Sequence, residues 1–386
     1  MNRCPERLLL EVATIVSNRA EPFNGNRRYV ATGGLDGGEL VESDEVGYET
    51  KPSRANLIAR EGDVLFARMQ ATNKVLLITE ETQNYIWSSG FAALRPGPNI
   101  RSRYLMHYLA SPLFQITKDA NCTGATQKSL PNGGLKKLAI PLIPLSQQDT
   151  IIEILDEAEE LGKLRIQADR CTADLIPALF HEMFGGLTKN TSLWSSLPLG
   201  EVVNFGSGAT PSKENPEFWN GQMPWVSPKD MKADEITDTE DHVSAAAFEK
   251  TNLQLIPKDT VLIVVRGMIL AHTVPIRRCR VPVAINQDMK ALLPKQSIEP
   301  EFLRWSLQAQ HAHLLTQVST AGHGTKKLDT EKLRAVTIPI PPLPLQKEFA
   351  NHVTEIRKLQ DEQAASRQRL DDLFQSCLHR AFNGEL

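Results

Sequence analysis

A single long internal repeat limits the possible folds of this chain more than any other feature. The motif Ile-Pro-x-x-Pro-Leu...Gln at residues 140–148 returns at residues 338–346, an offset of 198 positions. The same offset relates further pairs, which are Gly124 and Gly322, Lys128 and Lys326, Leu130 and Leu328, His181 and His379, and Phe184 and Phe382. This period is too long for a solenoid, whose repeats span about 20–50 residues. We therefore expect two copies of a whole domain, each followed by a long helix.

The repeat divides the chain into four segments. We expect a first domain at residues 1–145, a first helix at 146–186, a second domain at 187–343 and a second helix at 344–386. A chain of 386 residues also exceeds the usual size of a single core, which agrees with this division.

Each domain is expected to be of the α+β class, because short strand-like runs alternate with turns and a few helices. Residues 63–67 and 75–79 are typical of buried strands that flank a polar loop at 68–74. Tyr104 begins a run of helical periodicity, and paired glycines such as Gly133-Gly134 indicate turns.

The second copy repeats this pattern. Residues 255–256 and 261–265 are strand-like, and an arginine, Arg266, again follows. Because Arg68 lies 198 positions before Arg266, we expect the two arginines to be equivalent.

Both helical segments carry an apolar stripe at steps of three and four residues. In the first the stripe consists of Ile151, Ile154, Leu155, Ala158, Leu161, Leu164, Ala168, Leu175, Leu179 and Met183. In the second it consists of Phe349, Val353, Ile356, Leu370, Phe374, Cys377 and Ala381. We expect a kink near Pro177 and a helix end at Gly185-Gly186.

Neither helix can bury its stripe alone, so each is the natural partner of the other. An antiparallel coiled coil is expected, with a domain at each end. Gln360, Gln363 and Arg367 lie in the middle of the second stripe, where polar residues would fix the register.

Composition excludes several classes of protein. The chain has no run of about 18 apolar residues, so we expect no membrane segment, and its N-terminal residues contain no signal-peptide core. The five cysteines are scattered without a Cys-x-x-Cys pair, so neither a disulfide framework nor a zinc site is expected. The cytoplasm is the expected compartment.

The net charge of −3 conceals an uneven distribution. Residues 1–145 hold 17 basic and 14 acidic side chains, and residues 187–343 hold 17 and 16. The helical segments hold 3 and 9 at 146–186, and 6 and 7 at 344–386. The domains are therefore slightly positive and the helices negative.

No catalytic or cofactor motif is present. The run at residues 206–213 lacks the GxxxxGK[ST] spacing of a phosphate loop, and we interpret it as a hairpin turn. His311 and His313 are two apart on a predicted helix and face different sides, and no HExxH motif occurs. Acidic runs near Asp156 favour a solvated face or partner surface over an acid–base pair. We expect no metal, no bound cofactor and no enzymatic activity.

The loops are rich in basic and amide side chains, which bind phosphates and read base edges. Taken singly, most of these residues are more typical of ordinary solvated surface. Arg68 and Arg266 favour a binding role more than the others do, because both copies keep an arginine after the same strand. The candidates in the first domain are Arg27, Arg28, Arg68, Gln70, Asn73, Lys74 and Lys128. In the second domain they are Lys229, Arg266, Arg277, Arg278, Gln287, Lys326 and Lys327.

The chain resembles the specificity subunits of type I restriction-modification systems. The resemblance rests on the motif at 140–148 and 338–346, on the Gly-x-x-x-Lys-x-Leu loop before each copy, and on the long helix after it. Also similar is the Asn286-Gln287-Asp288 step of the second domain, which Trp87-Ser88-Ser89-Gly90 replaces in the first. The resemblance covers essentially the whole chain.

The resemblance implies that each domain is a target recognition domain reading one half of a split, asymmetric site in double-stranded DNA. The helices would set the distance between the halves and dock two methyltransferase subunits, which a restriction and translocase subunit joins. S-adenosylmethionine, ATP and Mg²⁺ would belong to those partners. The alternatives that remain open are a helical scaffold that never touches DNA and a stand-alone enzyme.

Overall fold

The structure is a computed structural model that describes residues 5–185, 194–383 and 385. It divides into two compact units, one formed by Met1–Ala168 with Gln363–Leu386 and the other by Asp169–Glu362. Each unit holds one copy of the repeat and part of each long helix. The segment limit expected between 186 and 187, with the helix end at Gly186, lies outside the described residues.

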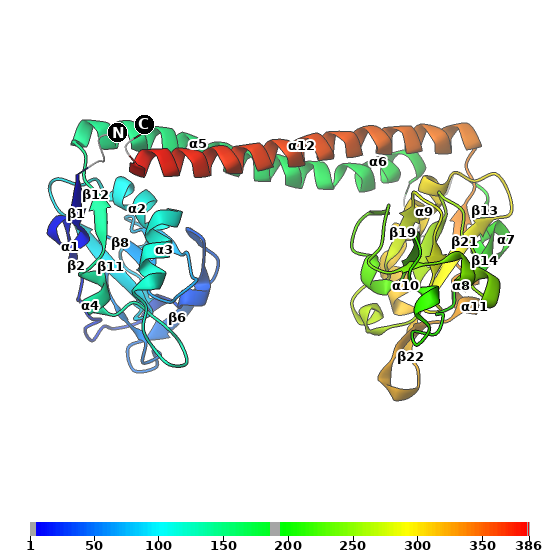
Figure 1. The fold of residues 1–386 in the computed structure, drawn as a ribbon, viewed down its shortest axis with the longest axis horizontal. Helices are drawn as coiled ribbons and strands as arrows, with labels where there is room; N and C mark the ends of the chain where they lie inside the picture. The colour runs from blue at the N-terminus through cyan, green and yellow to red at the C-terminus, as the bar shows by residue number, and fades with distance from the viewer. Residues whose placement is uncertain (1–4, 186–193, 384, 386) are drawn as a thin grey trace. The chain divides into compact units, whose positions relative to one another are not determined.

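The first unit combines short strands with a few helices (Figure 1). Its strands are β1 (Glu6–Leu8), β2 (Ala13–Ile15), β3 (Asn26–Val30), β4 (Leu35–Asp36), β5 (Glu39–Leu40), β6 (Asp44–Gly47), β7 (Ala55–Leu57), β8 (Val64–Ala67), β9 (Val75–Leu77), β10 (Ile86–Ser88), β11 (Phe91–Pro96) and β12 (Ala139–Pro141). Its helices are α1 (Leu9–Val12), η1 (Thr32–Gly34), α2 (Ser102–Ala110), α3 (Pro112–Ala120) and α4 (Asn132–Leu135), with most of α5 (Leu145–Ala173) and the end of α12 (Leu343–Asn383).

The second unit repeats this set of elements. Its strands are β13 (Ser196–Pro198), β14 (Val203–Ser207), β15 (Met223–Val226), β16 (Glu235–Ile236), β17 (His242–Val243), β18 (Val261–Val264), β19 (Ile276–Cys279), β20 (Ala284–Ile285), β21 (Met289–Pro294), β22 (Val318–Thr320), β23 (Lys326–Leu328) and β24 (Thr337–Pro339). Its helices are α6 (Leu175–Phe184), α7 (Leu199–Val202), η2 (Pro216–Phe218), η3 (Pro228–Asp230), α8 (Ala245–Lys250), η4 (Met268–Ala271), α9 (Pro300–Gln308), α10 (His311–Thr316), η5 (Gly322–Gly324) and α11 (Thr330–Arg334).

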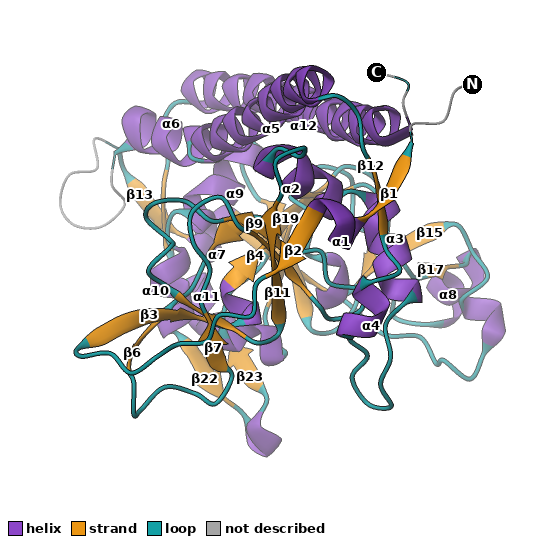
Figure 2. Cartoon of the chain, turned by 90° about the vertical axis from the view of Figure 1, so that its left-hand side faces the viewer, coloured by secondary structure: helices purple, strands orange, loops and turns teal. Residues whose placement is uncertain are grey.

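The sheets of the two units share part of their strand order. A four-stranded sheet in the order β2-β11-β8-β9 corresponds to a five-stranded sheet in the order β14-β21-β18-β19-β16. A second sheet in each unit contains one parallel pair, β3 with β10 and β15 with β20. Figure 2 distinguishes the strands of these sheets from the helices by colour. The α+β class and the duplication are confirmed.

The main core of each unit lies between its first sheet and its helices. In the first unit Phe66 of β8 and Tyr104 of α2 belong to this cluster, together with Leu378 of α12. In the second, Ile263 of β18 and Phe302 of α9 take the same places. The long helices are therefore part of each core, because their apolar side chains complete it.

The two long helices run antiparallel. Within the first unit, Arg165 of α5 donates from Nη2 to Ser366 Oγ of α12 over 2.9 Å. Within the second, the Phe180 ring of α6 packs on the Phe349 ring of α12 with centroids 5.4 Å apart. Low numbers on one helix thus meet high numbers on the other, which confirms the antiparallel pair.

Pro177 accounts for the break between α5 and α6. A proline at position 177 cannot donate a hydrogen bond to the carbonyl of residue 173, where α5 ends. The chain resumes as α6 at Leu175, two residues before Pro177, whereas α12 runs unbroken over 41 residues.

The apolar stripes differ in part from expectation. Ile151 and Leu155 are buried, but Leu161, Leu164 and Leu175 are 46%, 53% and 41% exposed. Ile176, Phe180 and Phe184 take the place of the expected Leu175, Leu179 and Met183 as the buried face of α6. The buried face runs across the break without a change of phase, because Thr172, Ile176, Phe180 and Phe184 follow one another at steps of four residues and all are buried.

The repeated glutamine anchors each long helix to its domain. Gln148 is 0% exposed, accepts from Arg101 N over 2.9 Å, and donates to Asn99 O over 3.0 Å and Ile143 O over 2.8 Å. Its counterpart Gln346 is 1% exposed, accepts from the Glu299 N–H over 2.9 Å and donates to a carbonyl over 2.7 Å. The motif therefore satisfies buried backbone groups where the helix leaves the domain.

A second junction uses opposite charges in the two copies. Arg103 of α2 binds Asp156 of α5 over 2.7 Å. The counterpart of Arg103 is Glu301 of α9, which binds Arg357 of α12 over 2.6 Å. The domain supplies the cation in the first copy and the anion in the second.

Three smaller expectations were wrong. Residues 255–256 form no strand, since only Ile256 makes an isolated bridge, to Val283. The run at 206–213 closes no hairpin, because β14 pairs only with β21. Gly133 and Gly134 lie in the short helix α4 and not in a turn.

Candidate nucleic-acid interface

Several candidate residues of the second domain come together where β18 ends. The backbone N–H of Arg266 donates to Asp288 O over 3.1 Å, and that of Gly267 donates to Lys326 O over 3.0 Å. These bonds place the loop after β18 between the 286–288 turn and the β22–β23 ribbon. Arg266, Gln287, Lys326 and Lys327 are thus brought to one end of the unit.

The side chains at this end differ in how they are bound. Arg266 is exposed, and its guanidinium has no hydrogen-bond or ion-pair partner in the described part of the chain. Gln287 accepts at Oε1 from Thr210 Oγ1. Lys326 donates to Thr320 Oγ1 over 2.9 Å, and Lys327 pairs with Asp329. Arg266 is the candidate most available to a ligand.

The first domain builds the same loop pair with different side chains. Gln70 N donates to Lys128 O over 3.1 Å, and Leu130 N donates to Arg68 O over 2.8 Å. Gln70 and Lys128 are exposed at the surface. They lie together as expected, at the place that Gly267 and Lys326 occupy in the second domain.

Arg68 is bound within the protein. Its guanidinium donates to Phe91 O over 3.3 Å, to Leu130 O over 3.1 Å and to Asn132 Oδ1 over 2.9 Å. Burial lowers the pKa of this arginine. Its geometry is that of a structural arginine that ties the loop to α4.

The equivalence expected between Arg68 and Arg266 was wrong by one residue. Phe91 pairs with Ala67, and its counterpart Met289 pairs with Val264. Arg68 therefore corresponds to Val265, which is 7% exposed, and Arg266 corresponds to Met69. Successive side chains of an extended chain point to opposite sides, so one arginine faces inward and the other outward.

The Asn286-Gln287-Asp288 step and its replacement form the same turn. Asn286 Oδ1 accepts from Asp288 N over 3.1 Å, and Ser88 Oγ accepts from Gly90 N over 3.2 Å. Asn and Ser both cap a backbone N–H two residues further on. The position at the tip, Gln287 in one copy and Ser89 in the other, is free to vary.

Three candidates of the second domain lie elsewhere. Lys229 pairs with Asp241 and Glu240, each over 3.0 Å, and its hydrogen bond to Asp241 raises its pKa. Arg277 and Arg278 lie on β19. Arg278 bonds to Asp259 over 2.6 Å; burial alone would lower its pKa, but this partner helps to raise it.

Four candidates of the first domain also lie outside the loop pair. Arg27 and Arg28 are exposed on β3, and Arg27 lies 4.6 Å from the centroid of the Phe23 ring. Asn73 donates to Ala110 O over 2.9 Å, and Lys74 donates to Thr32 O over 3.0 Å.

Sequence analysis missed the residue that holds the first-domain loop. Lys118 of α3 is 0% exposed and donates to Met69 O over 3.1 Å and Thr72 O over 2.7 Å, and burial lowers its pKa. A lysine in an amphipathic helix gives no signal of this role. Also missed was Lys290 of β21, which donates to Ser207 Oγ over 2.7 Å.

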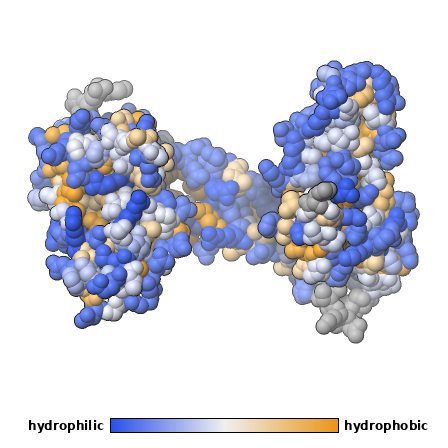
Figure 3. All heavy atoms as spheres, turned by 90° about the horizontal axis from the view of Figure 1, so that it is seen from below, coloured by the Kyte–Doolittle hydropathy of each residue, from blue (hydrophilic) through white to orange (hydrophobic). Residues whose placement is uncertain are grey.

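On the face that Figure 3 shows, the surface of each unit is largely hydrophilic, with some hydrophobic patches. Polar and basic loops with scattered apolar side chains are compatible with phosphate contacts. Among the described residues, His107, Asp156 and Glu159 bring potential metal ligands within 4.8 Å of one another. However, Arg103 and Lys163 already neutralise the two carboxylates over 2.7 and 2.8 Å.

Comparison with known families identifies this arrangement. The family described as "Type I restriction modification DNA specificity domain" matches residues 10–168 and 191–367, once for each copy. The chain belongs to this family. Its internal repeat is thus a repeat of the specificity domain, as the sequence resemblance implied.

Individual specificity subunits are similar over different lengths. The EcoR124I/EcoR124II specificity subunit of Escherichia coli is 30% identical over 55% of this chain and 53% of that protein. The MjaIX specificity subunit of Methanocaldococcus jannaschii is 25% identical over 38% of this chain and 34% of that protein. These two alignments span about half and one third of the relatives. The HindI specificity subunit of Haemophilus influenzae is 19% identical, with 100% of both chains covered.

Solved structures share the fold of the specificity subunit. A chain from a study of complex assembly and conformational transition of the type I R-M system is 23% identical, with 100% of this chain and 99% of that chain covered and a TM-score of 0.72. The HsdS subunit of Thermoanaerobacter tengcongensis is also 23% identical, with 100% and 98% covered and a TM-score of 0.52. In the described part of this chain, no helix is both long and apolar enough to cross a membrane.

Proposed function

We propose that this chain is the DNA-sequence-specificity subunit of a type I restriction-modification complex. Its two domains, at residues 1–145 and 187–343, bind the two halves of a bipartite, asymmetric site in double-stranded DNA. The helices at 146–186 and 344–386 fix the separation of the halves and dock two methyltransferase subunits. A restriction and translocase subunit joins through these.

One observation carries the proposal. The two domains share the scaffold of the loop pair but differ at its exposed positions, where Met69 corresponds to Arg266, and Ser129 corresponds to Lys327. Two domains that recognise different half-sites need a common scaffold and different side chains at its exposed loop positions. Arg266 and Gln287 are side chains that recognise guanine and adenine bidentately in the major groove.

The remaining candidates contribute in different ways. Gln70, Lys128, Lys326 and Lys327 lie at the loop pair and supply base or phosphate contacts, and Arg27 and Arg28 add charge from β3. Arg68, Asn73, Lys74, Arg277 and Arg278 bond within the protein and act on DNA only through the positions of the loops. Lys229 binds DNA only if it leaves its two carboxylates.

The helices support the docking of partners. Leu161, Leu164 and Ile166 are 46%, 53% and 48% exposed on α5, and Leu373 is 53% exposed on α12. Exposed apolar side chains gathered on a helix are typical of a protein interface. The acidic balance of residues 146–186 favours a basic partner surface.

The subunit itself is non-catalytic and works in the cytoplasm. S-adenosylmethionine, ATP and Mg²⁺ are bound by the methyltransferase and restriction subunits. The chain's own residues bind and orient the DNA so that the partner's active site reaches its base.

Binding assays on the full chain with its methyltransferase subunits test this function. We expect selection from random duplexes to enrich two short fixed segments separated by a constant gap, with affinity that falls as salt rises. A spacing near one helical turn, about 34 Å, suits the spacer. Equal binding to all sequences, or none in the intact complex, would favour the helical scaffold.

A further inference from the structure

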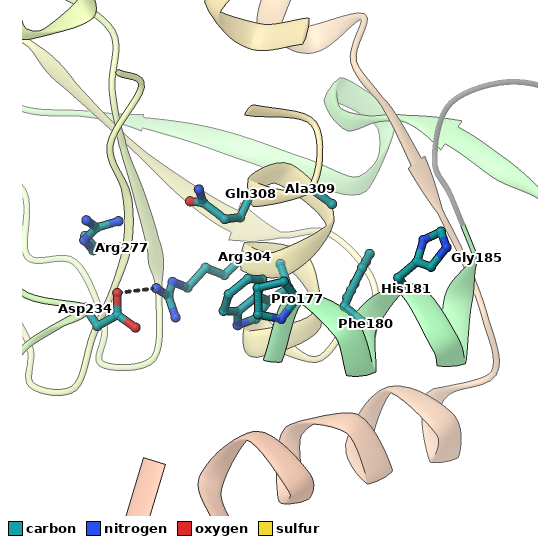
Figure 4. A pocket seen from close by; sticks show the side chains of 10 residues that line it. Pro177, Phe180, His181, Gly185, Asp234, Arg277, Arg304, Gln308 and Ala309 are labelled. Carbon is teal, nitrogen blue, oxygen red and sulfur yellow. Dashed lines mark ion pairs between the residues drawn. The ribbon is translucent and has the colours of Figure 1, made fainter. Parts of the chain in front are cut away.

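The second unit contains a pocket of about 610 Å³ on the helical side of its first sheet. Arg277 of β19 and Arg304 and Gln308 of α9 form its polar wall, and Phe180 of α6 and Trp305 form its apolar wall (Figure 4). The volume lies within the range of about 300–1,000 Å³ that small-molecule sites occupy. A mostly apolar wall with a few convergent polar groups is typical of such sites.

The polar wall is incompletely paired. Arg304 is 2% exposed, and it bonds to Asp234 over 3.0 Å and to Glu301 over 3.0 Å. Its Nε atom, Arg277 Nε and Gln308 Oε1 are buried without a hydrogen-bond partner in the described structure. Arg277 donates from Nη1 to its own strand, at Ile276 O over 3.0 Å. Buried polar atoms are normally satisfied, so unpaired ones need an explanation.

The charges on this wall favour an anion. Arg304 is already paired with Asp234 and Glu301. Arg277 has no ion-pair partner among the described residues, which leaves its positive charge uncompensated. Burial lowers the pKa of Arg277, and the neighbouring Arg304 lowers it further. A ligand carboxylate would relieve this repulsion in a partly desolvated site.

The first unit has a pocket at the equivalent place but of different chemistry. It measures about 450 Å³, and its lining includes Leu76, Met106 and Ala110. The cations that also line it, Arg103 and Lys163, are both paired with carboxylates. Leu76 pairs with Leu65, and Arg277 pairs with the corresponding Leu262. Arg277, Arg304 and Gln308 therefore replace Leu76, Met106 and Ala110. The scaffold of the pocket is shared, whereas the cations at these positions, Arg277 and Arg304, belong to the second copy.

We propose that the second-unit pocket binds a monocarboxylate with an aryl or alkyl body. The carboxylate lies at Arg277, and the body packs against Phe180 and Trp305. A free organic acid and an acidic group of a partner subunit share this chemistry. The proposal concerns a site away from the DNA loops and stands independently of sequence recognition.

Calorimetric titration of the full chain with 3-phenylpropionate tests the proposal, with 3-phenylpropanamide as the uncharged probe. We expect the acid to bind and the amide to bind at least tenfold more weakly, because it lacks the charge that Arg277 recognises. Arg277→Leu, which introduces the residue that Leu76 provides in the first unit, should weaken binding of the acid at least tenfold. Lys250→Ala, which removes an exposed ion pair to Glu217, should leave binding unchanged.

Gln308→Ala, which copies Ala110, provides a second variant if Arg277→Leu fails to fold, and we expect it to weaken the acid severalfold. Absence of binding, equal binding of acid and amide, or unchanged binding in the variants would overturn the proposal. Repeating the titration on the assembled complex distinguishes the two sources of the carboxylate, a free organic acid and a partner subunit. If 3-phenylpropionate keeps its affinity, the natural ligand is a free acid. If its binding is blocked, a carboxylate of a partner subunit fills the pocket.

Discussion

Glu301 provides the sharpest test of how the second domain is held to its helix. It is 1% exposed and lies among three arginines, Arg278, Arg304 and Arg357, at distances of 3.1, 3.0 and 2.6 Å. It also accepts from Trp305 Nε1 over 3.0 Å. Glu301→Gln keeps the shape of the side chain but removes the charge that these groups share.

The size of the effect follows from burial. Removing one partner of a buried ion pair costs about 3–5 kcal/mol, because the remaining charges lose their compensation. Each of the three arginines keeps a second carboxylate, which is Asp259 for Arg278, Asp234 for Arg304 and Glu235 for Arg357. We therefore expect a loss near the lower end, about 3 kcal/mol, in the free energy of unfolding of this unit.

The loss should depend on pH in a defined direction. Burial acts to raise the pKa of Glu301, but Arg357, Arg304 and Arg278 outweigh it and lower the pKa below its ordinary value. A depressed carboxyl pKa stabilises the folded state above the unfolded pKa of about 4.3, and this stability is lost as pH falls through the folded pKa. The difference between wild type and variant should hold from pH 7 to about pH 4.3 and shrink below it.

Urea unfolding followed by tryptophan fluorescence measures this difference, since four of the five tryptophans belong to the second copy. Glu217→Gln is the control, because its pair with Lys250 is exposed and contributes less than about 1 kcal/mol. If Glu301→Gln lies within 1 kcal/mol of wild type at pH 7, Glu301 does not hold the junction as argued.

Further outcomes follow from the junction and the loops. Gln148→Ala and Gln346→Ala should each lower unfolding free energy by about 1–3 kcal/mol in chemical denaturation, because buried backbone groups lose their partners; full stability would refute the anchoring role. Arg68→Ala should cost about 1–3 kcal/mol of stability, whereas Arg266→Ala should leave stability within about 0.5 kcal/mol and relax base preference at one position in selection from random duplexes. Relaxed base preference in Arg68→Ala together with a loss of stability in Arg266→Ala would contradict the one-residue shift between the two copies. Lys326→Ala should weaken binding to all DNA sequences alike and reduce the slope of log affinity against log salt by about 1. An unchanged slope would show that Lys326 does not contact a phosphate.

The duplication, the fold class and the antiparallel helices could be predicted from sequence because each leaves a periodic signal. The apolar steps at 3.6 residues predicted the helices, and the offset of 198 predicted a second domain. Pro177 predicted the break, but the predicted stripe of the following helix was one residue off. The buried face that includes Thr172 continues through Ile176 and Phe180.

The candidate site was less predictable because exposure and pairing depend on distant residues. Arg68 and Arg266 look equivalent in sequence, but a shift of one residue within the strands reverses their direction. Arg278 appears as a surface cation until Asp259 and Glu301, which lie 19 and 23 residues away, enclose it. Such pairings between distant residues leave no signal in the local sequence pattern.

Base-resolution methylation mapping tests the central claim most directly. DNA from cells that express this chain with its methyltransferase subunits should carry one methylated motif of two short segments around a fixed gap. Exchange of residues 187–343 for the second domain of another specificity subunit should change one segment and leave the other unchanged. A motif that changes in both segments, or methylation without any bipartite motif, would contradict two independent readers on a common spacer.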